Sequence, residues 1–147
     1  QYSSGKAISY TADNYTVKPS IDFSPFWCAF SYEGEFSFYN SKRQKMAKSS
    51  LFNWHQSVSA TATISHVDLS FSLVHYHNEL QEGSHLNTLL GDASAVWRMK
   101  KLRLSAELRN LFNKKNYMET IYSGISTLTD SYHLRPRELM ISAQYSF

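Results

Sequence analysis

Apolar and polar residues alternate with a period of two along most of this chain, most clearly over the last nine residues. Apart from Met140, one phase is apolar and the other polar: Leu139, Ile141, Ala143, Tyr145 and Phe147 against Ser142, Gln144 and Ser146. Successive side chains of a β-strand point to opposite faces, so this pattern predicts a strand with one apolar face. Its length suits a strand that crosses a bilayer at a tilt, about 9–11 residues.

The same alternation recurs upstream, so an all-β, antiparallel fold is expected. Between residues 102 and 109, apolar residues alternate with Arg103, Ser105, Glu107 and Arg109. Residues 68–79 are less regular, because the apolar phase changes between Leu73 and Val74, and a β-bulge would explain the slip. Seven strands are expected, at about 6–16, 26–40, 51–63, 68–79, 91–99, 102–113 and 132–147.

Short and long connections alternate between these strands. The links at 65–68 and 99–101 are tight, whereas those at 41–50, 79–90 and 114–131 are long and polar. Bacterial outer-membrane barrels have short turns on the periplasmic side and longer loops outside. The tight link at 99–101 is therefore expected at the periplasmic surface, together with the end of the chain.

The expected strand number indicates an incomplete barrel. Single-chain bacterial barrels have an even number of strands, from about eight upward, and a sheet in hydrocarbon must close because every backbone group needs a partner. Seven strands would leave an open edge near Ile8 and Tyr10. Residues 1–147 are therefore expected to form the C-terminal portion of a larger barrel.

The composition is compatible with membrane strands. Mean hydropathy is −0.41, and no run of about eighteen apolar residues is present, which excludes a transmembrane helix. A membrane-spanning strand shows lipid only every second residue, so its mean hydropathy stays low. The formal net charge of +3 is too small to indicate nucleic-acid binding, and the basic residues at 42–48 lack the spacing of a nucleic-acid motif.

A soluble β-sandwich with one buried face would show the same alternation. The expected strands are long for such a fold, in which about five or six residues is usual. The hairpin dipeptides Asn-Gly and Asp-Gly are absent. An antiparallel transmembrane β-barrel is therefore the expected fold, and a soluble β-domain is a remaining alternative.

Two motifs near the C-terminus resemble a known family, the TonB-dependent outer-membrane receptors. The segment Asn110-Leu111-Phe112-Asn113-Lys114-Lys115-Asn116-Tyr117 resembles one near the end of these receptors. Leu134-Arg135-Pro136-Arg137-Glu138, followed by Gln144-Tyr145-Ser146-Phe147, resembles their last strand. The resemblance covers about residues 91–147. The terminal pattern also resembles the signal that the barrel assembly machinery reads, carried here by Leu139, Ile141, Ala143, Tyr145 and Phe147.

The resemblance implies a 22-stranded barrel closed by an N-terminal plug, in the outer membrane of a Gram-negative bacterium. About seven C-terminal strands of that barrel would be present here. Such receptors import bulky nutrients with energy passed through TonB, which contacts their N-terminal part. The implied partners are outer-membrane lipid, the remainder of the barrel and its plug, the assembly machinery, TonB and a surface lipoprotein. No cofactor is implied, and a non-transporting structural or assembly component is the alternative function.

Few residues indicate chemistry. Glu33 and Glu35 share a phase, but no nucleophile accompanies them and no G-x-S-x-G motif is present. Together with Arg103, Glu107 and Arg109 they are expected to face a hydrated lumen. No enzyme activity is expected, and a barrel protease or lipase would require a Ser and a His to meet.

Two further pairs share a strand phase. Two His at i, i+2, such as His75 and His77, can bind a metal, but no further ligand has a recognisable spacing and polar lining near the outer rim is preferred. Arg135 and Arg137 lie on the phase of Leu139. Guanidinium groups suit phosphate, so these two are candidates for contact with lipopolysaccharide at the outer rim. A salt bridge to an extracellular loop carboxylate such as Glu119 or Asp130 is the alternative.

The terminal aromatic residue yields a test of the assembly signal. Such a signal acts before folding, while the strand edge is free, so deletion of Phe147 from the full-length protein should sharply lower its abundance in the outer membrane. Molecules that do insert should keep a nearly normal unfolding temperature. Unchanged abundance with a large fall in unfolding temperature would instead show that Phe147 is a packing residue.

Overall fold

The computed structural model describes residues 2–3, 6–7, 10–43, 49–79, 85–123 and 126–147, and every regular element in these ranges is a β-strand. No helix with the length and hydropathy of a membrane span occurs in these ranges. The strands are β1 (Tyr2–Ser3), β2 (Lys6–Ala7), β3 (Tyr10–Val17), β4 (Ser20–Phe23), β5 (Cys28–Arg43), β6 (Ser49–Ile64), β7 (Val67–Glu79), β8 (His85–Arg98), β9 (Leu102–Arg109), β10 (Asn116–Ser123), β11 (Ser126–His133) and β12 (Glu138–Tyr145).

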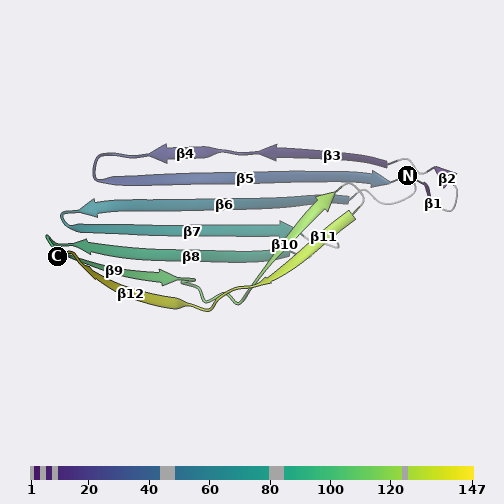
Figure 1. Cartoon of the computed structure of the whole chain (residues 1–147). Helices are drawn as coiled ribbons and strands as arrows, with labels where there is room; N and C mark the ends of the chain where they lie inside the picture. Colours follow the sequence, from purple (N-terminus) through teal and green to yellow (C-terminus); the bar gives the residue numbers. More distant parts are fainter. Residues whose placement is uncertain (1, 4–5, 8–9, 44–48, 80–84, 124–125) are drawn as a thin grey trace.

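One antiparallel sheet contains most of the chain (Figure 1). Its order is β12-β9-β8-β7-β6-β5-β3, and β4 also pairs with β5. The pairs β1–β2 and β10–β11 are separate. The expected all-β, antiparallel class is thereby confirmed. The sheet is open, because β12 and β3 lie at opposite edges and do not pair with each other in the part of the chain that the structure describes.

The register sorts the side chains into two faces, because directly paired residues in an antiparallel sheet point to the same side. We call one side the apolar face. It carries Tyr15, Val17, Ile21, Phe23, Cys28, Phe30, Tyr32, Phe36, Phe38, Phe52, Trp54, Val58, Ala60, Ala62, Ile64, Val67, Leu69, Phe71, Leu73, Leu89, Ala93, Ala95, Trp97, Leu102, Leu104, Ala106, Leu108, Leu139, Ile141, Ala143 and Tyr145. The opposite side is the polar face. It carries Ser31, Glu33, Glu35, Ser37, His55, Ser57, Ser59, Thr61, Thr63, Asp68, Ser70, Ser72, Asp92, Ser94, Arg98, Arg103, Ser105, Glu107, Arg109, Glu138, Ser142 and Gln144.

This sheet has almost no core of its own. Leu51, with 5% of its surface exposed, is the one buried hydrophobic residue in the described ranges. Large side chains of the apolar face remain open instead: Tyr15, Val17, Ile21, Phe23, Phe30, Phe38, Ile64, Leu69, Phe71, Trp97, Leu139, Ile141 and Tyr145. Backbone pairing between strands is therefore the main cohesion within the described part of the chain.

Several predicted strand boundaries were wrong. The strand expected at 91–99 begins at His85, and the one expected at 102–113 ends at Arg109. The expected loop at 114–131 contains the hairpin β10–β11, and the strand expected at 132–147 is divided between β11 and β12. Backbone conformation explains the breaks, because Asn110 and Asn113 have positive φ angles of 51° and 50°. Pro136, which has no N–H to donate, lies in the second gap.

The predicted bulge in β7 was also wrong. This strand pairs with β6 and β8 without interruption from Val67 to Asn78. The apolar residues change phase because the polar face is covered at this end. The ring of Tyr76 contacts His55 and Tyr117 with centroids 4.6 and 4.7 Å apart, and the Asn78 side chain donates to the Met118 carbonyl. The hairpin β10–β11 therefore folds over β7 (Figure 1).

The tight connections gather at one end of the sheet, as expected. Residues 65–66 and 99–101 link their strands directly, and the Arg98 amide donates to the carbonyl of His66. The C-terminus lies at this same end (Figure 1), where the Ser146 amide donates to the Lys101 carbonyl. The connections at 44–48 and 80–84 lie outside the described residues.

A substitution at Gly34 would test the close packing between β5 and the edge of the sheet. Its amide donates to the Pro19 carbonyl at 2.8 Å. A Cβ atom there would lie 2.9 Å from both Phe36 Cε2 and Tyr32 Oη, and 3.1 Å from Pro19 Cγ. Gly34→Val should lower the unfolding free energy by about 1–3 kcal/mol, as overpacking does. Denaturant unfolding measures the loss, and Ser37→Val on the opposite face of β5 is the control. Equal stability of both variants would contradict the packing described.

Candidate functional site

Aromatic rings gather at one end of the apolar face, near the ends of β5 and β6. Phe38 stacks on Phe52 with ring centroids 4.7 Å apart, and Phe36 lies 6.1 Å from Trp54. The indole N–H of Trp54 is buried and has no hydrogen-bond partner within the described residues. This end of the face therefore presents a large aromatic surface, and its one indole donor points away from solvent.

The other end of the face also carries aromatic residues. Trp97 lies at the end of β8 with 48% of its surface exposed, and Tyr145 ends β12 with 55% exposed. Phe147 follows it and meets the Tyr145 ring edge-on at 5.3 Å. Between the two aromatic ends the face is mostly small and aliphatic: Val58, Ala60, Ala62, Leu69, Leu73, Ala93, Ala95, Ala106, Leu108, Ile141 and Ala143.

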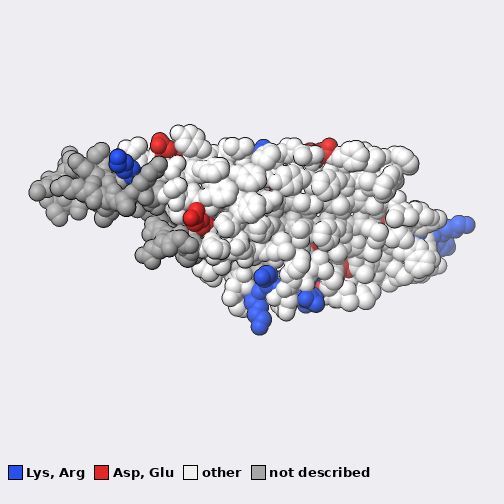
Figure 2. All heavy atoms as spheres, turned by 180° about the vertical axis from the view of Figure 1, so that it is seen from behind, with Lys and Arg blue, Asp and Glu red and all other residues white. Residues whose placement is uncertain are grey.

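Charged residues are absent from this face over a wide field. Between Cys28 and Phe38 on β5, Trp54 and Ile64 on β6, and Leu102 and Leu108 on β9, no Asp, Glu, Lys or Arg lies on its phase. Figure 2, which looks at the sheet from behind, shows a broad uncharged area with charged side chains mainly toward its margins. The apolar face is therefore a continuous band that crosses the sheet.

The border of this band runs obliquely to the strands. Its last apolar residue is Phe38 on β5, before Asn40, and Leu139 on β12, before Arg137. From Leu139, pairing leads across the sheet through Leu108, Ala93, Phe71 and Ala60 to Phe30. Phe38 lies eight residues beyond Phe30 along β5. The border thus shifts by eight residues over the five steps from β12 to β5.

The shift is stepped rather than uniform, because the apolar phase ends on β9 at Leu108, level with Leu139, and on β6 at Phe52, level with Phe38. On β8 the last apolar residue of the face is Leu89, before Asn87. Pairing leads from Leu89 across β7 and β6 to Gly34 on β5, which lies halfway between Phe30 and Phe38 in the sequence. On β7 the corresponding level holds His75 and His77, whose rings lie 5.2 and 5.8 Å from that of Trp54.

The polar face carries hydroxyl pairs and ion pairs instead. Ser70 contacts Ser94 at 2.7 Å, and Ser105 contacts Ser142 at 2.6 Å. Arg98 pairs with Asp68 near the tight turns. Beside them an open pocket of ≈ 340 Å³ is lined by Thr61, Ala62, Thr63, Asp68, Leu69, Ser70, Ser94, Val96, Arg98 and Arg103. These groups suit contact with water or with polar ligands.

The five residues expected to face a lumen share this polar face: Glu33, Glu35, Arg103, Glu107 and Arg109. Glu35 pairs with Lys18 from the segment between β3 and β4 at 3.1 Å. Arg109 donates to Glu107 two residues away at 2.6 Å. Glu35 and Glu107 therefore balance charges on their own or neighbouring segments.

Asn110 and Asn113 join the ends of β9 and β12, and sequence reasoning assigned them no role. We call residues 110–115 and 134–137 the junction. The Asn110 side chain donates to the carbonyls of Lys114 and Arg135, both at 2.7 Å, and accepts from the Lys114 amide at 2.9 Å. The Asn113 side chain accepts from the Arg137 amide at 3.1 Å. Asparagine tolerates positive φ, which was the available signal in the sequence.

The junction also spans the border of the apolar face. The Leu111 amide donates to the Gly91 carbonyl at 2.8 Å. A Cβ atom on Gly91 would lie 3.0 Å from Phe112 and 3.4 Å from Leu111. Its cationic residues Lys114, Lys115, Arg135 and Arg137 are exposed. None of the four forms an ion pair within the described residues, Asp130 included; the side chain of Glu119 lies outside them.

The other candidate groups show no assembled chemistry. His75 and His77 belong to the aromatic end of the apolar face rather than to polar lining, and His77 contacts Asn87 at 2.7 Å. No group of three His, Cys, Asp or Glu side chains in the described ranges could hold a metal ion. Ser65 and His66 do meet, with Oγ and Nδ1 2.8 Å apart, in the exposed β6–β7 turn. The nearby carboxylate, Asp68, bonds Thr63 and Arg98 instead.

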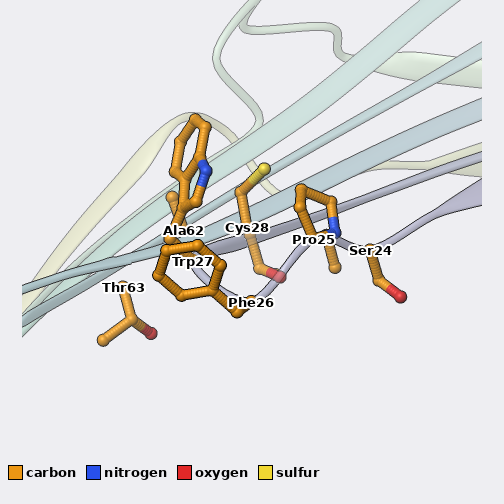
Figure 3. A pocket seen from close by; sticks show the side chains of 9 residues that line it. Ser24, Pro25, Phe26, Trp27, Cys28, Ala62 and Thr63 are labelled. Carbon is orange, nitrogen blue, oxygen red and sulfur yellow. The ribbon is translucent and has the colours of Figure 1, made fainter.

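A second pocket lies at the β4–β5 turn (Figure 3). It has a volume of ≈ 250 Å³ and is formed by residues 24–29 and 61–63. The Trp27 carbonyl accepts from the Thr63 amide, while the Phe26 side chain is fully exposed. Cys28 is free, and no acid or base lines this pocket with it. The pocket is therefore a feature of the turn rather than a reactive site.

Comparison of the chain with protein families, with curated proteins and with solved structures finds no match.

The junction yields a prediction about Asn110. Asn110→Ala removes three hydrogen bonds and places an alanine at positive φ, so it should lower the unfolding free energy by about 1–3 kcal/mol. Asn110→Gly restores the backbone freedom but not the hydrogen bonds, and should recover part of the loss. Asn14→Ala, on the exposed strand β3, is the control. Equal stability of the Ala and Gly variants would show that the backbone conformation contributes nothing.

Proposed function

We propose that this chain is part of the wall of an outer-membrane β-barrel in a Gram-negative bacterium, with the apolar face in contact with lipid. The observation that carries the proposal is the oblique border of the apolar face. At about 3.3 Å per residue and about 4.8 Å between strands, its shift corresponds to a slope of about 45°. Strands of transmembrane barrels tilt by about 35–45°, so a border perpendicular to the bilayer normal must cross them at such an angle.

The height of the band agrees with the same arrangement. From Phe52, which pairs with Phe38 at the border, to Ile64, β6 contributes twelve residue steps, or about 40 Å along the strand. At a tilt of about 45° this corresponds to about 28 Å along the bilayer normal, near the apolar height of about 25 Å in outer-membrane barrels. Aromatic residues lie at both ends of the band, as in the girdles of such barrels.

The opposite face supports a hydrated interior. Its hydroxyl pairs, together with the Asp68–Arg98 and Glu35–Lys18 pairs, need water or polar partners. An open sheet in hydrocarbon would leave the edges of β12 and β3 unpaired at a high cost in free energy. The proposal therefore requires that other strands cover both edges.

Within this class, we propose that the wall belongs to a TonB-dependent receptor that imports a bulky nutrient. The support is the resemblance of the segment from Asn110 to Tyr117 and of the last strand to that family. Import would depend on a plug and on TonB, beyond the residues described. A barrel that serves as a structural or assembly component would use the same wall, and uptake by the full-length protein distinguishes the two.

Ile141 provides the test of lipid contact. Its side chain is 75% exposed, so Ile141→Arg in water would cost little. In a bilayer, an arginine on the lipid face costs about 2–4 kcal/mol at the midplane and about 0–1 kcal/mol near the interfaces. Ile141 lies two residues inside the border at Leu139, so the variant should lose about 1–2 kcal/mol of stability when the full-length protein is folded in phospholipid vesicles. Ser142→Arg, one residue along β12 on the polar face, is the matched control.

Two outcomes would count against the proposal. If Ile141→Arg and Ser142→Arg have the same unfolding free energy in vesicles, the apolar face does not meet lipid. If the full-length protein stays in solution as a folded species and does not enter vesicles, a soluble β-domain with a covered apolar face replaces the barrel.

A further inference from the structure

The junction presents positive charge where the apolar face ends. Its exposed cationic side chains are Lys114, Lys115, Arg135 and Arg137. Figure 2 shows a group of Lys and Arg side chains at the lower margin of the uncharged area. The carboxylates nearest in the register, Glu107 and Glu138, lie with Arg109 on the polar face. The charge of the junction is therefore not balanced within the described residues.

The backbone that carries these cations is held in a fixed conformation. The Asn110 side chain bonds the main chain at Lys114 and Arg135, and Asn113 bonds the amide of Arg137. The Leu134 amide also donates to the Lys115 carbonyl at 2.8 Å. Residues far apart in the sequence thus meet in one compact turn. Binding an anion there would cost less conformational entropy than ordering a flexible loop.

The position of the junction relates it to the bilayer surface. Leu111 and Phe112 pack at Gly91, and Leu139, 63% exposed, follows Arg137 at the border of the apolar face. If the apolar face meets hydrocarbon, the cations stand at the level of the lipid headgroups. Lys and Arg at such a level extend their charged ends into the headgroup region.

We infer that the junction binds the phosphate of a membrane lipid headgroup, an inference that rests on the proposed function. Arg135 and Arg137 can each offer two parallel N–H donors to phosphate oxygens, the paired geometry that guanidinium groups form with phosphate. Lys114 and Lys115 add point charges that suit a doubly charged phosphate monoester. The lipid rather than free phosphate is the ligand, because the site is continuous with the apolar face.

The test compares the full-length protein in vesicles of phosphatidylcholine and of phosphatidylcholine with a fraction of phosphatidic acid. Phosphatidic acid should raise the unfolding temperature by several degrees, and high salt should reduce the shift. The variant with Lys114, Lys115, Arg135 and Arg137 all changed to Gln should lose the shift. The variant Lys100→Gln with Lys101→Gln removes two cations at the opposite end of the sheet and should keep it.

Further arms identify the ligand chemistry. The variant Arg135→Lys with Arg137→Lys keeps the charge but removes the paired donors, so it should lose part of the shift. It tests the site independently if the quadruple variant folds poorly. An equal shift with oleate would show a response to charge alone and overturn the inference. So would an equal shift with inorganic phosphate added to phosphatidylcholine vesicles, because the ligand would then be soluble.

The two proposals fail in different ways. If the wild-type protein does not insert into phosphatidylcholine vesicles, the proposed function fails and the inference fails with it. If it inserts normally but phosphatidic acid leaves its unfolding temperature unchanged, the membrane wall stands and only the phosphate site is overturned. The same holds if the quadruple variant keeps the full shift.

Discussion

Backbone hydrogen bonds between adjacent strands are the interaction on which this structure depends. A sheet that packs against a second layer shares its stability between the ladder and a hydrophobic core. Here Leu51 is the one buried hydrophobic residue in the described ranges. The long pairings β5–β6, β6–β7 and β7–β8 therefore supply most of the cohesion. Such pairing is strongest where water is excluded, because an amide in hydrocarbon has no other partner.

The chemistry of the two faces then determines the surroundings that the sheet can tolerate. An apolar face of this width in water would be a hazard for association, whereas the same face in lipid is stabilised by its contact. The polar face has the opposite requirement, since Asp68 and Arg98 keep part of their surface open beside each other. One wall that separates two solvents satisfies both faces without a second protein layer.

Alternation predicted the regular strands well, and it failed where side chains act on the backbone. Residues 139–145 and 102–109 could be assigned because each has one apolar phase and both were found paired in that phase. The hairpin β10–β11 was missed because its cover over Tyr76 is a long-range contact that no local period reveals. For the same reason the phase change at Val74 was read as a bulge. At the junction, the positive φ angles of Asn110 and Asn113 ended β9 earlier than its apolar pattern indicated.

The slope of the apolar border has a consequence for how the strands find their alignment during folding. A slip of one residue between neighbours exchanges the two faces and is strongly disfavoured. A slip of two residues keeps every side chain on its proper face, so the alternation alone cannot detect the error. The border can detect it, because such a slip would move Asn40 or Arg137 by about 6.6 Å along the strand, into register with the apolar residues of the neighbouring strand. Information that selects the correct alignment thus resides at the ends of the strands, in the residues that contribute least to the pattern by which the fold is recognised.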